Sequence, residues 1–247
     1  MFNHNQNSSF EAVPLSNTWQ NEAELDAAVS SCLTRVFLRM FVALLITAAT
    51  AYFVYTNEAI MHLIFTNMPL FFGIIIAQVA LVIFISARIE KMAVSTANAL
   101  FFLYAVLMGV TLSFIFIVYE IGLIWNAFLI SALMFSAMAI FGALTKRDLT
   151  SIGSYLFMGL IGVIIASVVN MFLRSEMLDF IISYIAVFVF LGLTAYNTQN
   201  TKRMLRRAHE SSQKDAIARI SVLGALSLYL NFINLFMRIL RIMGRNR

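Results

Sequence analysis

The chain has 247 residues, of which 61% are hydrophobic and 12% are charged. Ordinary globular domains contain roughly 45–50% apolar and about 25% charged residues, so this composition excludes a typical water-soluble domain and indicates a membrane protein. The formal charge of +5 does not indicate nucleic-acid binding, because the basic residues form short clusters beside apolar segments, as membrane topology signals do.

The first 30 residues are rich in Asn, Gln and Ser and contain neither a basic start nor an apolar stretch, so they are not a signal peptide. We expect residues 1–30 to be a flexible, polar, cytoplasmic tail that joins a short helix starting near Asn21. Residues 31–247 are expected to form a single seven-helix transmembrane domain. Cys32 is the only cysteine, so no intrachain disulfide can form.

Six apolar runs follow, each long enough to cross a bilayer, since a hydrocarbon core of about 30 Å needs roughly 20 residues at about 1.5 Å each. The connectors between these runs are short, so neighbouring helices should form antiparallel hairpins. The predicted spans cover residues 37–55, 69–87, 98–119, 124–144, 154–173 and 179–199.

A seventh segment, residues 220–240, is less apolar, and its small and polar residues recur at steps of three or four. This spacing places them on one stripe of a helix. Because unpaired polar groups in hydrocarbon cost several kcal/mol, other helices or a water-filled cavity should cover the stripe. We therefore predict an all-α bundle of about seven spans with this helix buried inside it. The stripe consists of Ser221, Gly224, Ser227, Asn231, Asn234, Arg238 and Arg241.

Lysine and arginine residues concentrate on one side of this topology, whereas the opposite connectors hold only Arg174. The amino terminus is therefore predicted to be cytoplasmic. The last segment conflicts with this rule, because a complete crossing would translocate Arg238, Arg241, Arg245 and Arg247. Two alternatives remain open, a full span with an external carboxy terminus or a re-entrant segment that returns to the cytoplasm.

The spans contain no recognisable catalytic set, because all three histidines lie outside them and no HExxH motif is present. We therefore expect neither an enzyme nor a bound cofactor. No acidic residue lies within the apolar body of a span, which argues against a proton-coupled transporter. Taken singly, the remaining polar residues are most simply interhelical hydrogen-bonding groups. They are Gln78, Asn98, Ser113, Asn170, Asn197, Gln199, Asn231 and Asn234.

Two late segments are distinctive, LTAYNTQNTKRM at residues 193–204 and LGALSLYLNFINLFMRILRIMG at residues 223–244. Together they resemble the Bax inhibitor family, in particular its bacterial YbhL/YccA branch. The likeness extends to residues 63–83, to TKRDL at residues 145–149, and to short elements near residue 170. The resemblance implies three helix hairpins around a central, polar-faced seventh helix and a pH-regulated calcium leak. It also implies modulation of cell death in eukaryotes and, for bacterial members, a link to a membrane-bound protease.

The resemblance further implies a pH sensor made of facing aspartates in the sixth and seventh spans, but the matching positions here hold Asn197 and Asn231. Facing carboxylates share a proton and titrate towards neutrality, whereas amides do not titrate. Arg88 matches an arginine that pairs with the sixth-span carboxylate as a latch, although its position alone slightly favours snorkelling to the interface. Gln78 stands where some relatives carry a carboxylate. With these positions neutral, Ca²⁺ should bind weakly, as a permeant ion.

The leading hypothesis is a bacterial inner-membrane protein whose cation-leak pathway has lost its pH control, with Gln78, Ser227 and Asn234 as additional polar groups along it. The rival hypothesis is a non-conducting regulatory protein that uses its acidic tail and its basic loop at residues 202–219 to bind a membrane-bound protease or another membrane complex. A membrane enzyme ranks third for want of a catalytic set. The bilayer is the expected partner, and no nucleic acid is.

Overall fold

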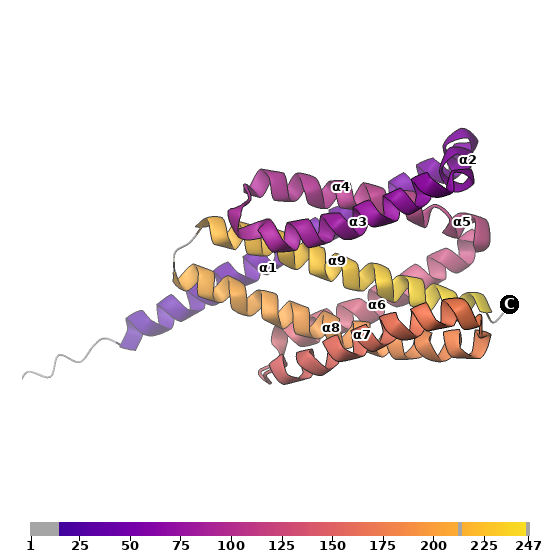
Figure 1. Ribbon diagram of the computed structural model, residues 1–247. Coiled ribbons are helices and arrows are strands. Elements are labelled where there is room, and N and C mark those ends of the chain that lie inside the picture. Colours follow the sequence, from indigo (N-terminus) through magenta and orange to yellow (C-terminus); the bar gives the residue numbers. More distant parts are fainter. Residues whose placement is uncertain (1–14, 212–213, 246–247) are drawn as a thin grey trace, which may run out of the picture.

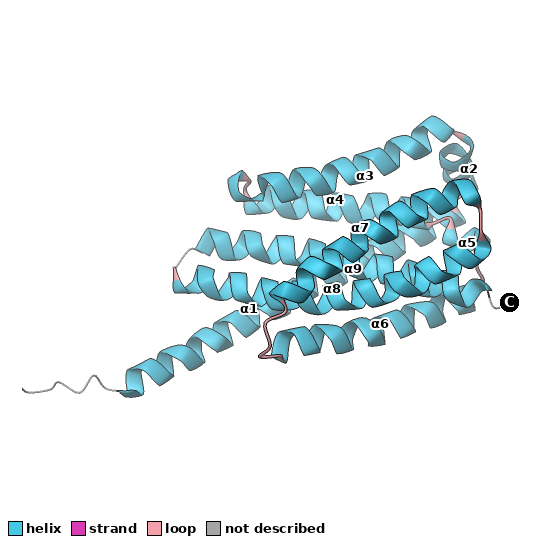
Figure 2. Ribbon diagram, turned by 60° about the horizontal axis from the view of Figure 1, so that its bottom comes forward, coloured by secondary structure: helices cyan, strands magenta, loops and turns pink. Residues whose placement is uncertain are grey.

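The computed structural model describes residues 15–211 and 214–245, with side-chain surroundings from Glu22 onward. Almost all of these residues are helical, and no strand occurs among them (Figure 2). Seven segments within them are long and apolar enough to cross a membrane, so the chain is an all-α membrane protein. These segments are Glu22–Thr56, Met68–Lys91, Val94–Val118, Ile121–Leu144, Thr150–Leu173, Glu176–Glu210 and Lys214–Arg245.

The helices follow one another with short connections, and successive long helices alternate in direction (Figure 1). Each predicted span lies within one of these segments, except that the span predicted at residues 98–119 extends one residue beyond Val118. The short helix α2 was not predicted; it begins after Asn57, whose side chain accepts a hydrogen bond from the backbone N–H of Ile60 at 3.2 Å. In chain order the elements are α1 (Leu15–Thr56), α2 (Glu58–Thr66), α3 (Met68–Arg88), the 3₁₀ turn η1 (Ile89–Lys91), α4 (Val94–Leu112), α5 (Ile115–Val118), α6 (Ile121–Leu144), α7 (Thr150–Leu173), α8 (Glu176–Glu210) and α9 (Lys214–Arg245).

Helix α1 begins earlier than predicted, at Leu15 rather than near Asn21, and continues without a break to Thr56. Residues 15–20, which were expected to belong to the flexible tail, are therefore helical, and the short helix expected from near Asn21 is continuous with the first span. Residues 1–14 lie outside the described part. The physical reason is that residues 15–56 contain neither proline nor glycine, so nothing in the sequence stops the helix. Its first turns project from the bundle (Figure 1).

Helix α9 occupies the centre of the bundle, packed against α8, α1, α6 and α4. Two-thirds (67%) of its most apolar stretch is buried, against 11% for α3 and for α7, which confirms the predicted burial of this helix. It runs the length of the bundle as one unbroken helix and ends opposite the end where α1 begins (Figure 1). This geometry fits the full-span alternative, because a re-entrant segment would break and turn back.

The helices alternate in direction as expected, but their neighbours are not always those next in sequence. Helices α7 and α8 form a packed hairpin, whereas α1 packs mainly against α4 and α9, and α6 packs mainly against α8 and α9. The surface between these contacts is apolar, as a lipid-facing surface should be. Phe172 and Tyr155 on α7, for example, are 77% and 74% exposed.

Candidate functional site

The two asparagines that replace the expected acid pair lie on α8 and α9, the two helices that pack together most extensively. Asn231 is buried, and its side-chain Nδ2 has no hydrogen-bond partner within the described residues. Asn197 is half-buried. No hydrogen bond joins the two amides in the described part of the chain.

The unpartnered amide of Asn231 distinguishes it from Gln78 and Gln199, the other buried amides among the described residues, whose side chains are hydrogen-bonded. A buried donor that makes no hydrogen bond costs about 1–3 kcal/mol, so packing alone does not account for an asparagine at this position. By contrast, Ser221 and Thr198, which lie on the same two helices, each donate to a carbonyl oxygen of their own helix, at 2.8 Å each. Asn231 is therefore the strongest candidate among the buried amides of the described residues.

The remaining residues of the predicted stripe fall in different surroundings. Gly224 faces α8 closely, because a Cβ added there would lie 2.6 Å from Cγ2 of Thr201. Ser227 is half-buried. Asn234 is exposed, and its amide donates to the carbonyl of Leu230 in its own helix at 2.8 Å. The stripe is thus covered by α8 in its first half but reaches the surface of the bundle at Asn234.

Gln78 and Arg88, both on α3, make no hydrogen bond to Asn197 or Asn231 within the described residues. The amide of Gln78 donates to the carbonyl of Leu107 at 2.8 Å and to Thr111 Oγ1 at 3.2 Å, which ties α3 to α4. Gln78 therefore serves as interhelical glue. The Arg88 side chain is exposed at the end of α3 and makes no hydrogen bond or ion pair with any described residue, so the latch with Asn197 is not formed.

A contact that sequence reasoning missed joins the α6–α7 connector to α8. The Gln199 side chain accepts a hydrogen bond from the backbone N–H of Leu149 at 2.9 Å and donates to the carbonyl of Arg147 at 2.7 Å. Arg203, one turn along α8, pairs with Asp148 at 2.8 Å. These residues belong to TKRDL and NTQNTKRM, two of the segments that carry the resemblance, so their joint appearance could have signalled the contact.

Asp148 lies in this connector, outside the spans, and its ionised form is stabilised. Hydrogen bonds from the hydroxyl and then the backbone N–H of Thr150 lower the pKa of the Asp148 carboxyl, with a smaller contribution from Arg203. The carboxylate therefore stays charged and holds Arg203 against the connector at neutral pH.

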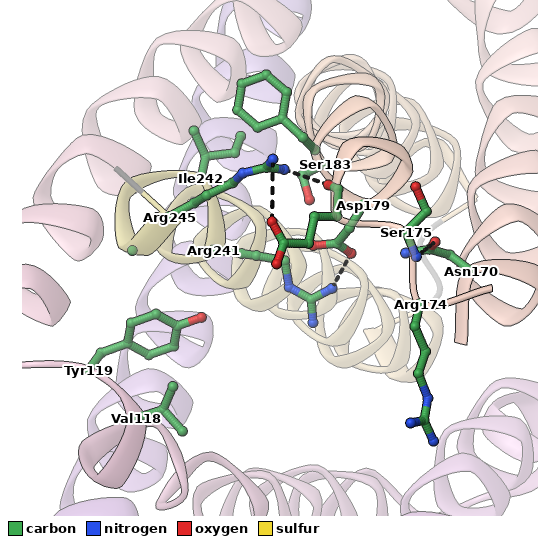
Figure 3. Close-up of a pocket in the computed structure, with 13 residues that line it drawn as sticks. Val118, Tyr119, Asn170, Arg174, Ser175, Asp179, Ser183, Arg241, Ile242 and Arg245 are labelled. Atoms are coloured by element: carbon green, nitrogen blue, oxygen red, sulfur yellow. Dashed lines mark hydrogen bonds and ion pairs between the residues drawn. The ribbon is translucent and has the colours of Figure 1, made fainter. Parts of the chain in front are cut away.

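A second polar region lies at the opposite end of the bundle, where α9 ends (Figure 3). A cavity of about 640 Å³ opens there between α5, α7, α8 and α9. Arg241 pairs with Asp179 at 2.7 Å, and Arg245 lies 3.8 Å from the Glu176 carboxylate, so two ion pairs fasten α9 to the start of α8. The sequence had placed Arg241 on the polar stripe and had indicated that both arginines are topology signals, without predicting these ion pairs.

The match to known proteins covers nearly the whole chain. A family model described as "Inhibitor of apoptosis-promoting Bax1" matches residues 29–247. The chain belongs to the Bax inhibitor family. The resemblance drawn from residues 193–204 and 223–244 is thus confirmed, and the match includes both asparagine positions and the arginine-lined cavity.

Several bacterial relatives of this Bax inhibitor family member extend over similar lengths. The inner membrane protein YbhL of Escherichia coli strain K12 is 46% identical over 221 residues, which are 90% of this chain and 94% of that protein. A protein of Borreliella burgdorferi is 46% identical over 215 residues, 87% of this chain and 92% of its own length. A protein of Rickettsia prowazekii is 37% identical over 235 residues, 94% and 97% of the two chains.

Proposed function

We propose that this protein is a non-enzymatic cation-leak protein of the bacterial inner membrane, with a cytoplasmic amino terminus, whose leak does not respond to pH. The observation that carries the proposal is the buried, unpartnered amide of Asn231 on the central helix, at the position where the family resemblance implies a titrating acid. The location is supported by the relative YbhL, an inner membrane protein of Escherichia coli.

The chemistry of the pair explains the loss of pH control. An asparagine offers a neutral carbonyl oxygen that neither gains nor loses a proton over physiological pH. Ca²⁺ prefers carboxylate oxygens, so neutral amides at residues 197 and 231 would hold it weakly and let it pass. The half-buried Ser227, one turn before Asn231, adds a further polar group on the same side of α9.

The proposal is tested by measuring Ca²⁺ flux into proteoliposomes between acidic and alkaline pH. The unmodified protein should leak at a rate that varies little with pH. The double variant Asn197→Asp with Asn231→Asp should acquire a steep pH response, because two carboxyls that face each other, as the family resemblance implies, titrate as a coupled pair.

The matched control is Asn98→Asp, an amide-to-acid change on α4, where the native amide only bonds the carbonyl of Val94 in its own helix at 3.0 Å. This variant should leave the flux independent of pH. A steep pH response in the unmodified protein, or an absence of flux in both the unmodified protein and the double variant, would contradict the proposal.

The second candidate is a non-conducting regulatory protein that binds a membrane-bound protease or another membrane complex. One contact favours it: Asp26 on α1 pairs with Arg206 of the basic segment at 3.1 Å. The acidic and basic segments therefore lie side by side as one surface. Deleting residues 1–25 should abolish partner capture and spare Ca²⁺ flux if this surface is the functional one; loss of flux with capture retained would favour the leak.

A further inference from the structure

The cavity at the carboxy-terminal end of the bundle has more positive than negative groups. Three arginines and two acids line it, and each acid has an arginine partner: Asp179 with Arg241 and Glu176 with Arg245. Arg174 makes no ion pair or side-chain hydrogen bond within the described residues. Its guanidinium group is therefore available to a ligand that carries negative charge.

A further buried donor lines the same cavity without a partner. Ser183, on α8, is 1% exposed and lines the cavity, yet its hydroxyl has no hydrogen-bond partner among the described residues. Because an unsatisfied buried donor is costly, the Ser183 hydroxyl points to an acceptor that comes from outside the protein.

The geometry of the cavity suits a group with several acceptor oxygens. The guanidinium group of Arg241 and the hydroxyl of Tyr119 point towards the space between them, and the Arg174 side chain, which also lines the cavity, extends away from the Arg241–Asp179 pair (Figure 3). The first turn of α8 also borders it, and a helix amino terminus favours negative charge. At about 640 Å³, the cavity falls within the range of roughly 300–1,000 Å³ that is usual for small-molecule sites.

We propose that this cavity binds a phosphate group, supplied either by the headgroup of an anionic lipid or by a free phosphate. Arginine side chains recognise phosphate through paired, charge-assisted hydrogen bonds, and the oxygens of a phosphate can engage several donors at once. The cavity lies at the end of the spanning helices, where lipid headgroups stand.

The test compares melting temperatures in nanodiscs. In discs of phosphatidylcholine, inorganic phosphate is titrated against potassium chloride at equal ionic strength, and a saturable rise identifies a free phosphate as ligand. A higher melting temperature in phosphatidylglycerol discs than in phosphatidylcholine discs, without a response to free phosphate, identifies a lipid headgroup. Ligands that bind only the folded state stabilise it in this concentration-dependent way.

The decisive variant is Arg174→Gly. Arg174 has φ 52°, a left-handed conformation that glycine adopts more readily, so this change removes the charge without weakening the backbone. The ligand-dependent rise should require roughly tenfold more phosphate or disappear, since a charge-assisted hydrogen bond is lost. Ser183→Ala, which removes the buried hydroxyl, should reduce the same rise.

The matched control is Arg207→Ala, an exposed arginine of α8 at the opposite end of the bundle. It should keep the full ligand-dependent rise in melting temperature. The proposal is overturned if neither phosphate nor phosphatidylglycerol raises the melting temperature, if the rise persists in Arg174→Gly, or if Arg207→Ala abolishes it equally.

Discussion

At the centre of the bundle, a small group of hydroxyls joins three helices. The Tyr229 hydroxyl on α9 lies 2.7 Å from Thr47 Oγ1 on α1, and Thr47 also lies 2.9 Å from the carbonyl oxygens of Ala43 and Ala105. Because carbonyl oxygens only accept, they share the single hydroxyl proton of Thr47, and Tyr229 therefore donates to Thr47. The ring of Tyr229 packs edge-on against Tyr104 on α4, so α1, α4 and α9 share one buried contact.

This order of donors predicts unequal effects of two conservative substitutions. Tyr229→Phe removes one hydrogen bond and should lower the free energy of unfolding by about 0.5–1.5 kcal/mol. Thr47→Val leaves the buried Tyr229 hydroxyl without an acceptor and should cost more, about 1–3 kcal/mol. The double variant should lose less than the sum of the two. Reversible unfolding in mixed micelles measures these values, and equal costs with full additivity would contradict the assigned donor order.

The sequence predicted which polar residues lie in the membrane better than it predicted what they do. Gln78 and Asn231 are both buried amides in apolar helices, but Gln78 bonds the carbonyl of Leu107 on α4 while Asn231 has an unpartnered donor. Asn234, three residues after Asn231, is exposed. The spacing of residues along one helix specifies only the direction in which their side chains point. The role of an amide depends on which backbone carbonyl of the neighbouring helix lies within hydrogen-bonding distance.

At the scale of helices, chain order and apolar length predicted the spans, and short connectors predicted their alternating directions. They did not predict which helices touch, because a short connector fixes the direction of the next helix and leaves its other contacts to side-chain packing. Close packing of α6 on α8 depends on Gly142, since a Cβ added there would lie 2.8 Å from Cα of Ala195. A contact between backbones of this kind is typical of membrane helices.

Gly142→Ala should therefore push α6 away from α8 and lower the stability of the bundle by about 1–3 kcal/mol, as overpacked positions do. The control is Gly162→Ala on α7, where an added Cβ meets nothing within 4 Å. That change should be neutral or slightly stabilising, because alanine favours a helix over glycine by about 1 kcal/mol. Melting temperatures of the two variants in the same detergent check the difference; equal shifts would show that the α6–α8 contact tolerates a methyl group.

For the molecule as a whole, the seven segments and the alternation of the long helices place the start of α1 and the end of α9 at opposite ends of the bundle (Figure 1). The arginine count alone left the side of the carboxy terminus open. In the structure, Arg241 and Arg245 have acidic partners on α8 and thus hold α9 in place, a role that a count of basic residues does not reveal.

Fusions at the two termini should consequently report from opposite sides of the membrane. A reporter that is active only outside the cytoplasm should work at the carboxy terminus and fail at the amino terminus, while one that is active only in the cytoplasm should show the reverse. A cytoplasmic signal from both termini would mean that α9 does not cross completely in the cell.

The length of α1 has a mechanical consequence. Its 42 residues span about 63 Å at about 1.5 Å each, roughly twice the thickness of a hydrocarbon core. Helix α1 is unbroken, and its Thr47 contacts Tyr229 on α9. The first turns of α1 and its buried middle therefore form one stiff rod. Tilting the first turns of α1 at the membrane surface would shift Thr47 and, through Tyr229, the central helix α9. A binding event at the surface would thus reach the interior of the bundle without any loop having to refold.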